Sequence, residues 1–250
     1  MFKLININSK SIVMKKYFVV FLFALFATLS YAQRPQGHVS IIPRVGLDIA
    51  NLSGNKIYYT SSTMKSMKSK YNARFVGGVD VEYQLLPMSS ISLGAFYSQQ
   101  GCRFPDYSSQ VEIESVSGSK ETENWEKQRW KLDYVQVPLM FNQYVSEGLA
   151  VKVGVQMGFL MNAKVSYTIN LVDFDKDGKV VSEKNTSTNT DIKKTLRTMD
   201  FTIPIGVSYE YQNVILDLRY NFGIKSIYKD KEMPKEKNSF LLFTMGYRIF

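Results

Sequence analysis

The best candidate for metal chemistry is the acidic run Asp173-Phe174-Asp175-Lys176-Asp177-Gly178. Carboxylates at alternate positions before a glycine open the twelve-residue calcium loop, which ends on a bidentate glutamate. That last position is Lys184 in this chain, and Glu183 lies one residue early. We therefore interpret the run as an acidic turn in an external loop, with weak calcium binding by Asp173, Asp175 and Asp177 as the alternative.

Histidine is the usual general base of hydrolases, and His38 is the only histidine of the chain. It precedes the first predicted strand, and no carboxylate or hydroxyl is spaced around it in a catalytic pattern. Cys102 is the only cysteine, so no internal disulfide can form. The sequence predicts a protein without enzymatic activity, with no catalytic, cofactor-binding or metal residues and no cofactor.

A long alternating segment dominates the rest of the sequence. Every second residue from 149 to 171 is apolar, and the residues between are mostly polar or glycine. Side chains alternate between the two faces of a strand, so this pattern predicts one strand with an apolar face and a polar face. Globular strands average about five or six residues, whereas strands of transmembrane barrels are longer. A soluble lipocalin-like barrel or a sandwich, with the apolar face inward, is the alternative.

Seven further segments show the same alternation, at 39–50, 73–85, 91–99, 130–144, 199–211, 214–223 and 239–250. The segment 130–144 changes phase, and a bulge near Tyr134 would explain this. The connections alternate between long (51–72, 101–127, 172–195, 224–238) and short. Outer-membrane barrels have this arrangement, with short periplasmic turns and long external loops. The sequence therefore predicts an all-β fold, an eight-stranded antiparallel up-and-down transmembrane β-barrel in the outer membrane of a Gram-negative bacterium.

The two faces of the predicted strands differ in chemistry. The apolar face is expected to contact lipid, for example through Val151, Val153, Val155, Phe201, Ile203, Leu216 and Leu218. The polar face carries five basic and six acidic side chains: Arg44, Arg74, Lys152, Arg219 and Arg248 with Asp48, Asp80, Glu82, Asp200, Glu210 and Asp217. An eight-stranded barrel has an interior that side chains fill. We expect these charges to pair there and to close the lumen.

The N-terminus predicts export. Lys15 and Lys16 precede an apolar run, and Ser30-Tyr31-Ala32 offers small residues at the positions that signal peptidase reads. The predicted organisation is a signal peptide at 1–32 and a barrel domain at 33–250. Cleavage after Ala32 lowers the formal net charge from +9 to +5. With this modest charge and no recognisable motif, no nucleic-acid partner is expected.

Several motifs resemble one known family. They are Leu132-Asp133-Tyr134-Val135-Gln136-Val137-Pro138-Leu139, the first strand at 43–52, Leu218-Arg219-Tyr220-Asn221-Phe222-Gly223-Ile224 and the closing Gly246-Tyr247-Arg248-Ile249-Phe250. Together they are similar to the Bacteroidetes outer-membrane β-barrel proteins often called the PorT family. The resemblance implies an integral outer-membrane barrel. For the family's namesake it implies a part in type IX secretion or gliding.

Three function classes follow. The leading hypothesis is a structural or interaction barrel, linked to secretion-system proteins and inserted by the barrel-assembly machinery. The alternatives are a small-solute pore or surface ligand-binding barrel, and an enzyme. Lysines at 56–70 and 225–237 are expected either to be solvated or to meet lipopolysaccharide phosphates.

Overall fold

The computed structural model describes residues 35–53, 56–58, 66–112, 120–175, 177–230, 232 and 235–250. The predicted signal peptide at 1–32 lies outside the described residues, as do residues 59–65 of the lysine-containing segment 56–70. Within the described part, no helix is long and apolar enough to cross a membrane. The secondary structure there consists of strands, turns and bends.

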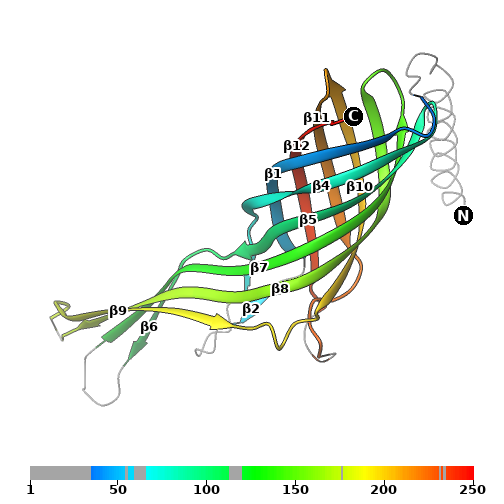
Figure 1. The fold of residues 1–250 in the computed structure, drawn as a ribbon. Coiled ribbons are helices and arrows are strands. Elements are labelled where there is room, and N and C mark those ends of the chain that lie inside the picture. Colours follow the sequence, from blue (N-terminus) through cyan, green and yellow to red (C-terminus); the bar gives the residue numbers. More distant parts are fainter. Residues whose placement is uncertain are drawn as a thin grey trace, which may run out of the picture.

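Eight long strands form a closed antiparallel ring in the order β7-β5-β4-β1-β12-β11-β10-β8, and β8 pairs back with β7 (Figure 1). They are β1 (Val39–Ser53), β4 (Asn72–Leu86), β5 (Ser89–Arg103), β7 (Lys120–Tyr144), β8 (Leu149–Phe174), β10 (Met199–Tyr211), β11 (Val214–Gly223) and β12 (Lys237–Tyr247). Closure pairs every strand of the ring on both sides, so the barrel has no free edge. The predicted eight-stranded up-and-down barrel is confirmed.

The short turns, the start of β1 and the end of β12 lie at the same end of the barrel. Two residues connect β4 to β5, and Gln212 and Asn213 connect β10 to β11. These two turn residues have φ values of 46° and 71°, as a type I′ hairpin turn requires. β1 begins and β12 ends at this same end (Figure 1). We assign it to the periplasm, because outer-membrane barrels keep their short turns and termini there.

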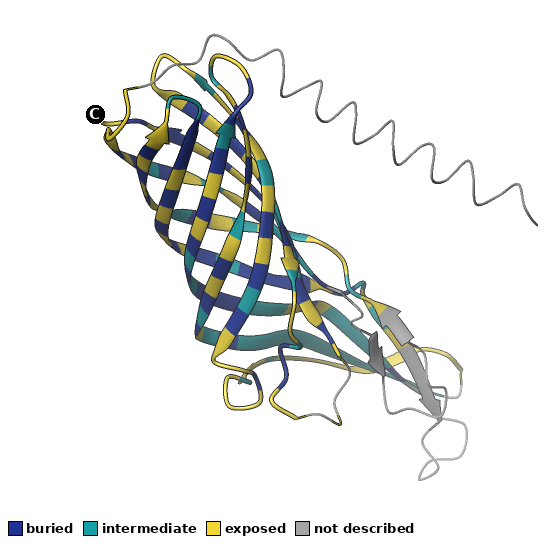
Figure 2. Cartoon of the chain, turned by 90° about the vertical axis from the view of Figure 1, so that its right-hand side faces the viewer, coloured by how far each residue is buried: buried dark blue, intermediate teal, exposed yellow. Residues whose placement is uncertain are grey.

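Burial alternates along the ring strands (Figure 2). On β8, Val151, Val153 and Val155 are 40–60% exposed on the outer wall, whereas Ala150 and Lys152 are almost completely buried. Ile203, Leu216 and Leu218 are exposed too, and Phe201 is half-buried. The apolar face therefore points outward, as predicted, and a soluble barrel with an apolar interior is wrong for this chain.

Four additional strands of the described residues lie outside the ring. β6 (Tyr107–Glu112) pairs with β7, and β9 (Val180–Asp191) pairs with β8. A hairpin of β2 (Lys56–Tyr58) and β3 (Ser66–Lys68) lies in the first long connection. The prediction that 172–195 is a loop is wrong, because β8 continues to Phe174 and β9 follows. The ends of β7 and β8 thus carry a four-stranded sheet, β6-β7-β8-β9, beyond the barrel (Figure 1).

Two strand details differ from the sequence prediction. The register of β7 and β8 shifts between Asp133 and Tyr134, near the predicted bulge, but the additional residue is Met161 of β8. Leu132 and Tyr134 are buried on the inner face, so β7 keeps its phase there. The last strand ends at Tyr247 rather than at 250. Beyond it, Ile249 still pairs with Ile41 of β1.

Candidate functional site

The barrel interior holds the main concentration of buried charged side chains in the described structure. All eleven acidic and basic residues predicted to face inward are buried or half-buried there. They come from five different strands and the C-terminal segment, and the alternation of side chains along each strand places them on the inner face. Barrel closure then brings them together in layers stacked along the barrel axis.

The central layer is a five-residue ion cluster. Asp217 of β11 lies 2.6 Å from Arg219 Nε, 2.7 Å from Lys152 Nζ and 3.5 Å from Arg44 Nη1. Asp80 of β4 pairs with Arg44 at 2.8 Å and with Arg219 at 3.0 Å. All five side chains are at most 3% exposed. Buried charges cost several kcal/mol each unless they are paired, so three cations and two carboxylates stabilise one another in this layer.

A second charged layer lies at the periplasmic end. Arg248 lies 3.0 Å from Glu210 and 3.3 Å from Glu82, and its Nη2 also contacts the Tyr144 hydroxyl at 3.3 Å. The Tyr144 hydroxyl donates a 2.5 Å hydrogen bond to Glu82. Arg248 follows the last residue of β12, so this layer links the C-terminal segment to β4, β7 and β10.

A polar layer lies on the extracellular side of the central cluster. Ser98 donates a hydrogen bond to Asp48, and Gln100 donates to Ser98 at 2.9 Å. Asn238 donates to Gln100 and, at 3.3 Å, to Asp200. Between this layer and the ion cluster, Val76, Phe96 and Leu242 form a small apolar contact. The chain of donors and acceptors thus joins β1, β5, β12 and β10 across the lumen.

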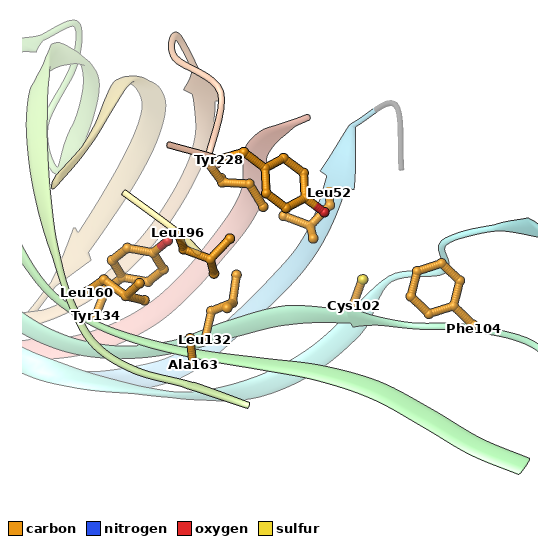
Figure 3. Close-up of a cluster of buried hydrophobic side chains, with 10 residues drawn as sticks. Leu52, Cys102, Phe104, Leu132, Tyr134, Leu160, Ala163, Leu196 and Tyr228 are labelled. Carbon is orange, nitrogen blue, oxygen red and sulfur yellow. The ribbon is translucent and has the colours of Figure 1, made fainter. Parts of the chain in front are cut away.

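An apolar cap covers the extracellular end of the lumen (Figure 3). Leu196, Ile227 and Tyr228 from the connections β9–β10 and β11–β12 pack on barrel side chains. Leu196 points toward Leu132, and Tyr228 points toward Leu52 (Figure 3). The remaining buried members are Cys102, Phe104, Tyr134, Leu160 and Ala163. Sequence reasoning missed this cap, because isolated apolar residues in polar loops carry no periodic signal.

Tyr228 is anchored by its hydroxyl as well as by its ring. The hydroxyl donates to Glu236 Oε2 at 3.2 Å, and the ring packs edge-on against Trp130 at 6.3 Å between centroids. Burial raises the pKa of this phenol, and the neighbouring Glu236 carboxylate raises it further. The residue therefore stays protonated, as a donor to Glu236, at physiological pH.

The residues considered for catalysis and metal binding lie apart from one another. His38 Nδ1 is 3.3 Å from Ser40 Oγ at the rim of a periplasmic cavity of about 310 Å³, but Ser40 is only 3% exposed. Asp175 accepts backbone amide hydrogen bonds from Asp177 and Lys179 at 2.9 and 2.8 Å, as an acidic turn does. Among the described residues, no three histidine, cysteine, aspartate or glutamate side chains converge on a common metal position.

Comparison with known proteins agrees with this architecture. Residues 31–229 match the family described as outer membrane protein beta-barrel domain. The chain belongs to this family. It is an outer-membrane β-barrel of the Gram-negative envelope, and the predicted location is confirmed. No curated protein matches its sequence.

Solved structures with a similar arrangement share little sequence with this outer-membrane barrel. Ail, the attachment invasion locus protein of Yersinia pestis, is 11% identical at a TM-score of 0.38, over 86% of this chain and 100% of that chain. Neisserial surface protein A is 12% identical at a TM-score of 0.36, over 84% and 97% of the two chains.

Proposed function

We propose that this protein is a non-conducting anchor barrel that presents the sheet β6-β7-β8-β9 as an interaction surface outside the cell. The observation that supports a closed barrel is the central ion cluster, in which Arg44, Arg219 and Lys152 meet Asp80 and Asp217 across the lumen. The charged layer of Arg248 lies on its periplasmic side, and the polar layer and the apolar cap lie on its extracellular side. A small-solute pore would need a water-filled path past all of these layers.

The sheet outside the ring supports the interaction role. From Trp130 to Lys120 the strand β7 continues for about 33 Å at 3.3 Å per residue. β9 is the edge of this sheet, and its side chains are almost all exposed. A polar edge strand offers unpaired backbone donors and acceptors to an extended segment of another protein. Anchoring the barrel alone does not require a sheet of this length.

The resemblance to PorT-like proteins makes secretion-system components the first partners to test. We also propose that residues 1–32 are removed as a signal peptide and that the barrel-assembly machinery inserts the remaining 33–250. The lumen does not favour an enzymatic role, since its charged side chains are engaged in ion pairs or in hydrogen bonds to neighbouring polar side chains.

The register of the strands defines a test of the interaction role. Thr168 pairs with Ser187, and Ser108 pairs with Asn124. Replacing 168–187 and 108–124 each by Asn-Gly would therefore close two short hairpins without disturbing the ring. Proteins that crosslink to the wild type in intact cells should be lost from this shortened variant. Equal crosslinking by both forms would contradict the role of the sheet.

Conductance measurements distinguish the proposed anchor barrel from a small-solute pore. The wild-type protein and the shortened variant should both produce no steady current in planar bilayers. Steady, large conductance from the wild type would reject the closed barrel and favour the solute pore.

A further inference from the structure

A group of basic residues lies where β7 and β8 leave the barrel. Lys127, Arg129 and Lys131 of β7, with Ser166, Thr168, Ser187 and Asn189 of the neighbouring strands, line a depression of about 270 Å³. Lys164 of β8 is paired directly opposite Lys131. We name Lys127, Arg129, Lys131 and Lys164 the basic belt.

The basic belt faces outward, on the side that contacts lipid lower down the barrel. Lys131 stands four residues from Val135 on the same face of β7, and Val135 pairs with the outward-facing Phe159. On β8 the extra residue Met161 changes the phase, so Ala163 turns inward and Lys164 turns outward. The bulge thus replaces the apolar outer row of β8 with a polar one.

The height of the belt corresponds to the membrane surface. The apolar outer row of β8 runs from Leu149 to Met161, about 40 Å along the strand at 3.3 Å per residue. A strand tilt of about 40° reduces this to about 30 Å along the membrane normal, close to the thickness of the hydrocarbon core. Lys164 follows three residues later, at the level of the headgroups. The Lys193 ammonium lies at the extracellular end of the apolar row, where it donates to the Met161 carbonyl at 2.7 Å.

No direct ion pair neutralises the basic belt within the described part of the chain. None of the four cations forms an ion pair there, although Glu126 of β7 lies on the same face and Asp191 of β9 is paired directly opposite Lys164. Asp191 instead accepts the backbone amide of Lys193 at 2.8 Å. Like charges directly opposite on neighbouring strands destabilise a sheet, and Lys131 and Lys164 are such a pair. A bound anion between them would remove this repulsion.

We propose that the basic belt binds the phosphate groups of the outer-leaflet glycolipid, lipopolysaccharide. The acyl chains of this lipid would lie along Val135, Phe159 and Met161, while its phosphates lie between Lys131, Lys164 and Arg129. The hydroxyl and amide groups of Ser166, Thr168 and Asn189 are suited to the sugars and phosphate oxygens. The inference uses the outer-membrane orientation of the barrel and does not depend on the proposed partner proteins.

Binding of lipid A by the refolded mature protein in phosphatidylcholine nanodiscs tests the belt. The wild type should prefer bisphosphorylated to fully dephosphorylated lipid A by about tenfold or more. Each lysine removed should cost about fivefold, since one cation near an anionic surface contributes about 1 kcal/mol. Lys131→Gln with Lys164→Gln should therefore abolish most of the preference, and Lys131→Arg with Lys164→Arg should retain it.

A control pair removes the same charge far from the membrane. Lys179 and Lys184 are exposed in and beside β9 near the far end of the sheet, so Lys179→Gln with Lys184→Gln should bind like the wild type. Equal losses in both pairs would reject the belt in favour of general charge attraction. Absence of any preference for phosphorylated lipid A would overturn the proposal. Tighter binding of inositol hexakisphosphate would assign the belt to a soluble ligand and overturn the lipid assignment.

The unfolding temperature supplies a second test. The difference between variant and wild type should change sign when lipid A is added. Without lipid A, Lys131→Gln should unfold at a higher temperature than the wild type, because the repulsion between Lys131 and Lys164 is gone while Lys164 keeps Asp191 opposite it. With bisphosphorylated lipid A, the wild type should unfold at the higher temperature. The same order in both conditions would contradict a bound phosphate. A heat-modifiable gel shift verifies that each variant has folded.

Discussion

Arg219 of β11 reaches Asp80 of β4 across the lumen, with 3.0 Å between Nη2 and Oδ2. Two strands, β12 and β1, separate them around the ring. The two residues are 139 positions apart in the sequence. Their contact therefore depends on closure of the whole barrel, and it makes the ion cluster a reporter of correct assembly.

Asp217→Asn should destabilise the barrel strongly. Asp217 pairs with Arg44, Lys152 and Arg219, so its loss leaves three buried cations with one carboxylate. Breaking a buried ion pair costs about 3–5 kcal/mol, and less where water enters. The temperature at which the heat-modifiable gel band shifts should fall. Asp177→Asn, in an exposed turn, is the matched control and should leave this temperature unchanged.

Gly94→Ala should disturb the same cluster from β5. Gly94 is paired with Asp80, and a Cβ added there would lie 2.3 Å from the Asp80 carboxylate. Overpacking of this kind costs about 1–3 kcal/mol. At Gly158 the nearest atom to an added Cβ is 3.3 Å away, so Gly158→Ala should cost less. Equal free energies of unfolding for the two variants would contradict this account of Gly94.

Single cysteines should distinguish the two walls of the barrel. Cys102 is buried, so Cys102→Ser provides the background. In that background Val153→Cys and Leu218→Cys should react with a lipid-phase maleimide, because both side chains are exposed on the outer wall. Thr202→Cys, whose site is 3% exposed in the lumen, should remain unlabelled. The reverse pattern would place the apolar face inside.

Mass spectrometry of the protein from outer membranes tests the predicted processing. The measured mass should match a chain that begins at Gln33, since Ala32 ends the signal-peptidase site. Ala32→Arg should block cleavage and retain the leader. A mature chain that keeps residues 1–32 would show that the segment acts as an anchor.

The alternation of side chains made the barrel and its two walls predictable from the sequence. A period of two needs no knowledge of neighbours, so Val153 and Lys152 could be assigned to opposite faces directly. The ion pairs were not predictable one by one, because the partner of Arg219 depends on strand order and stagger. The Met161 bulge and β9 were also missed. Their residues are polar or out of phase, and cross-strand pairing with β7 and β8 decides their conformation.

The apolar cap and the central ion cluster lie at different heights in the lumen, and this separates stability from permeability. Leu196 and Tyr228 cap the extracellular end, whereas Arg44 and Asp217 close the centre. Leu196→Ala should lower stability by about 2–5 kcal/mol, as the loss of a buried leucine does. It should not create a pore, because the central cluster remains. A conducting Leu196→Ala barrel in planar bilayers would show instead that the cap alone keeps the lumen closed.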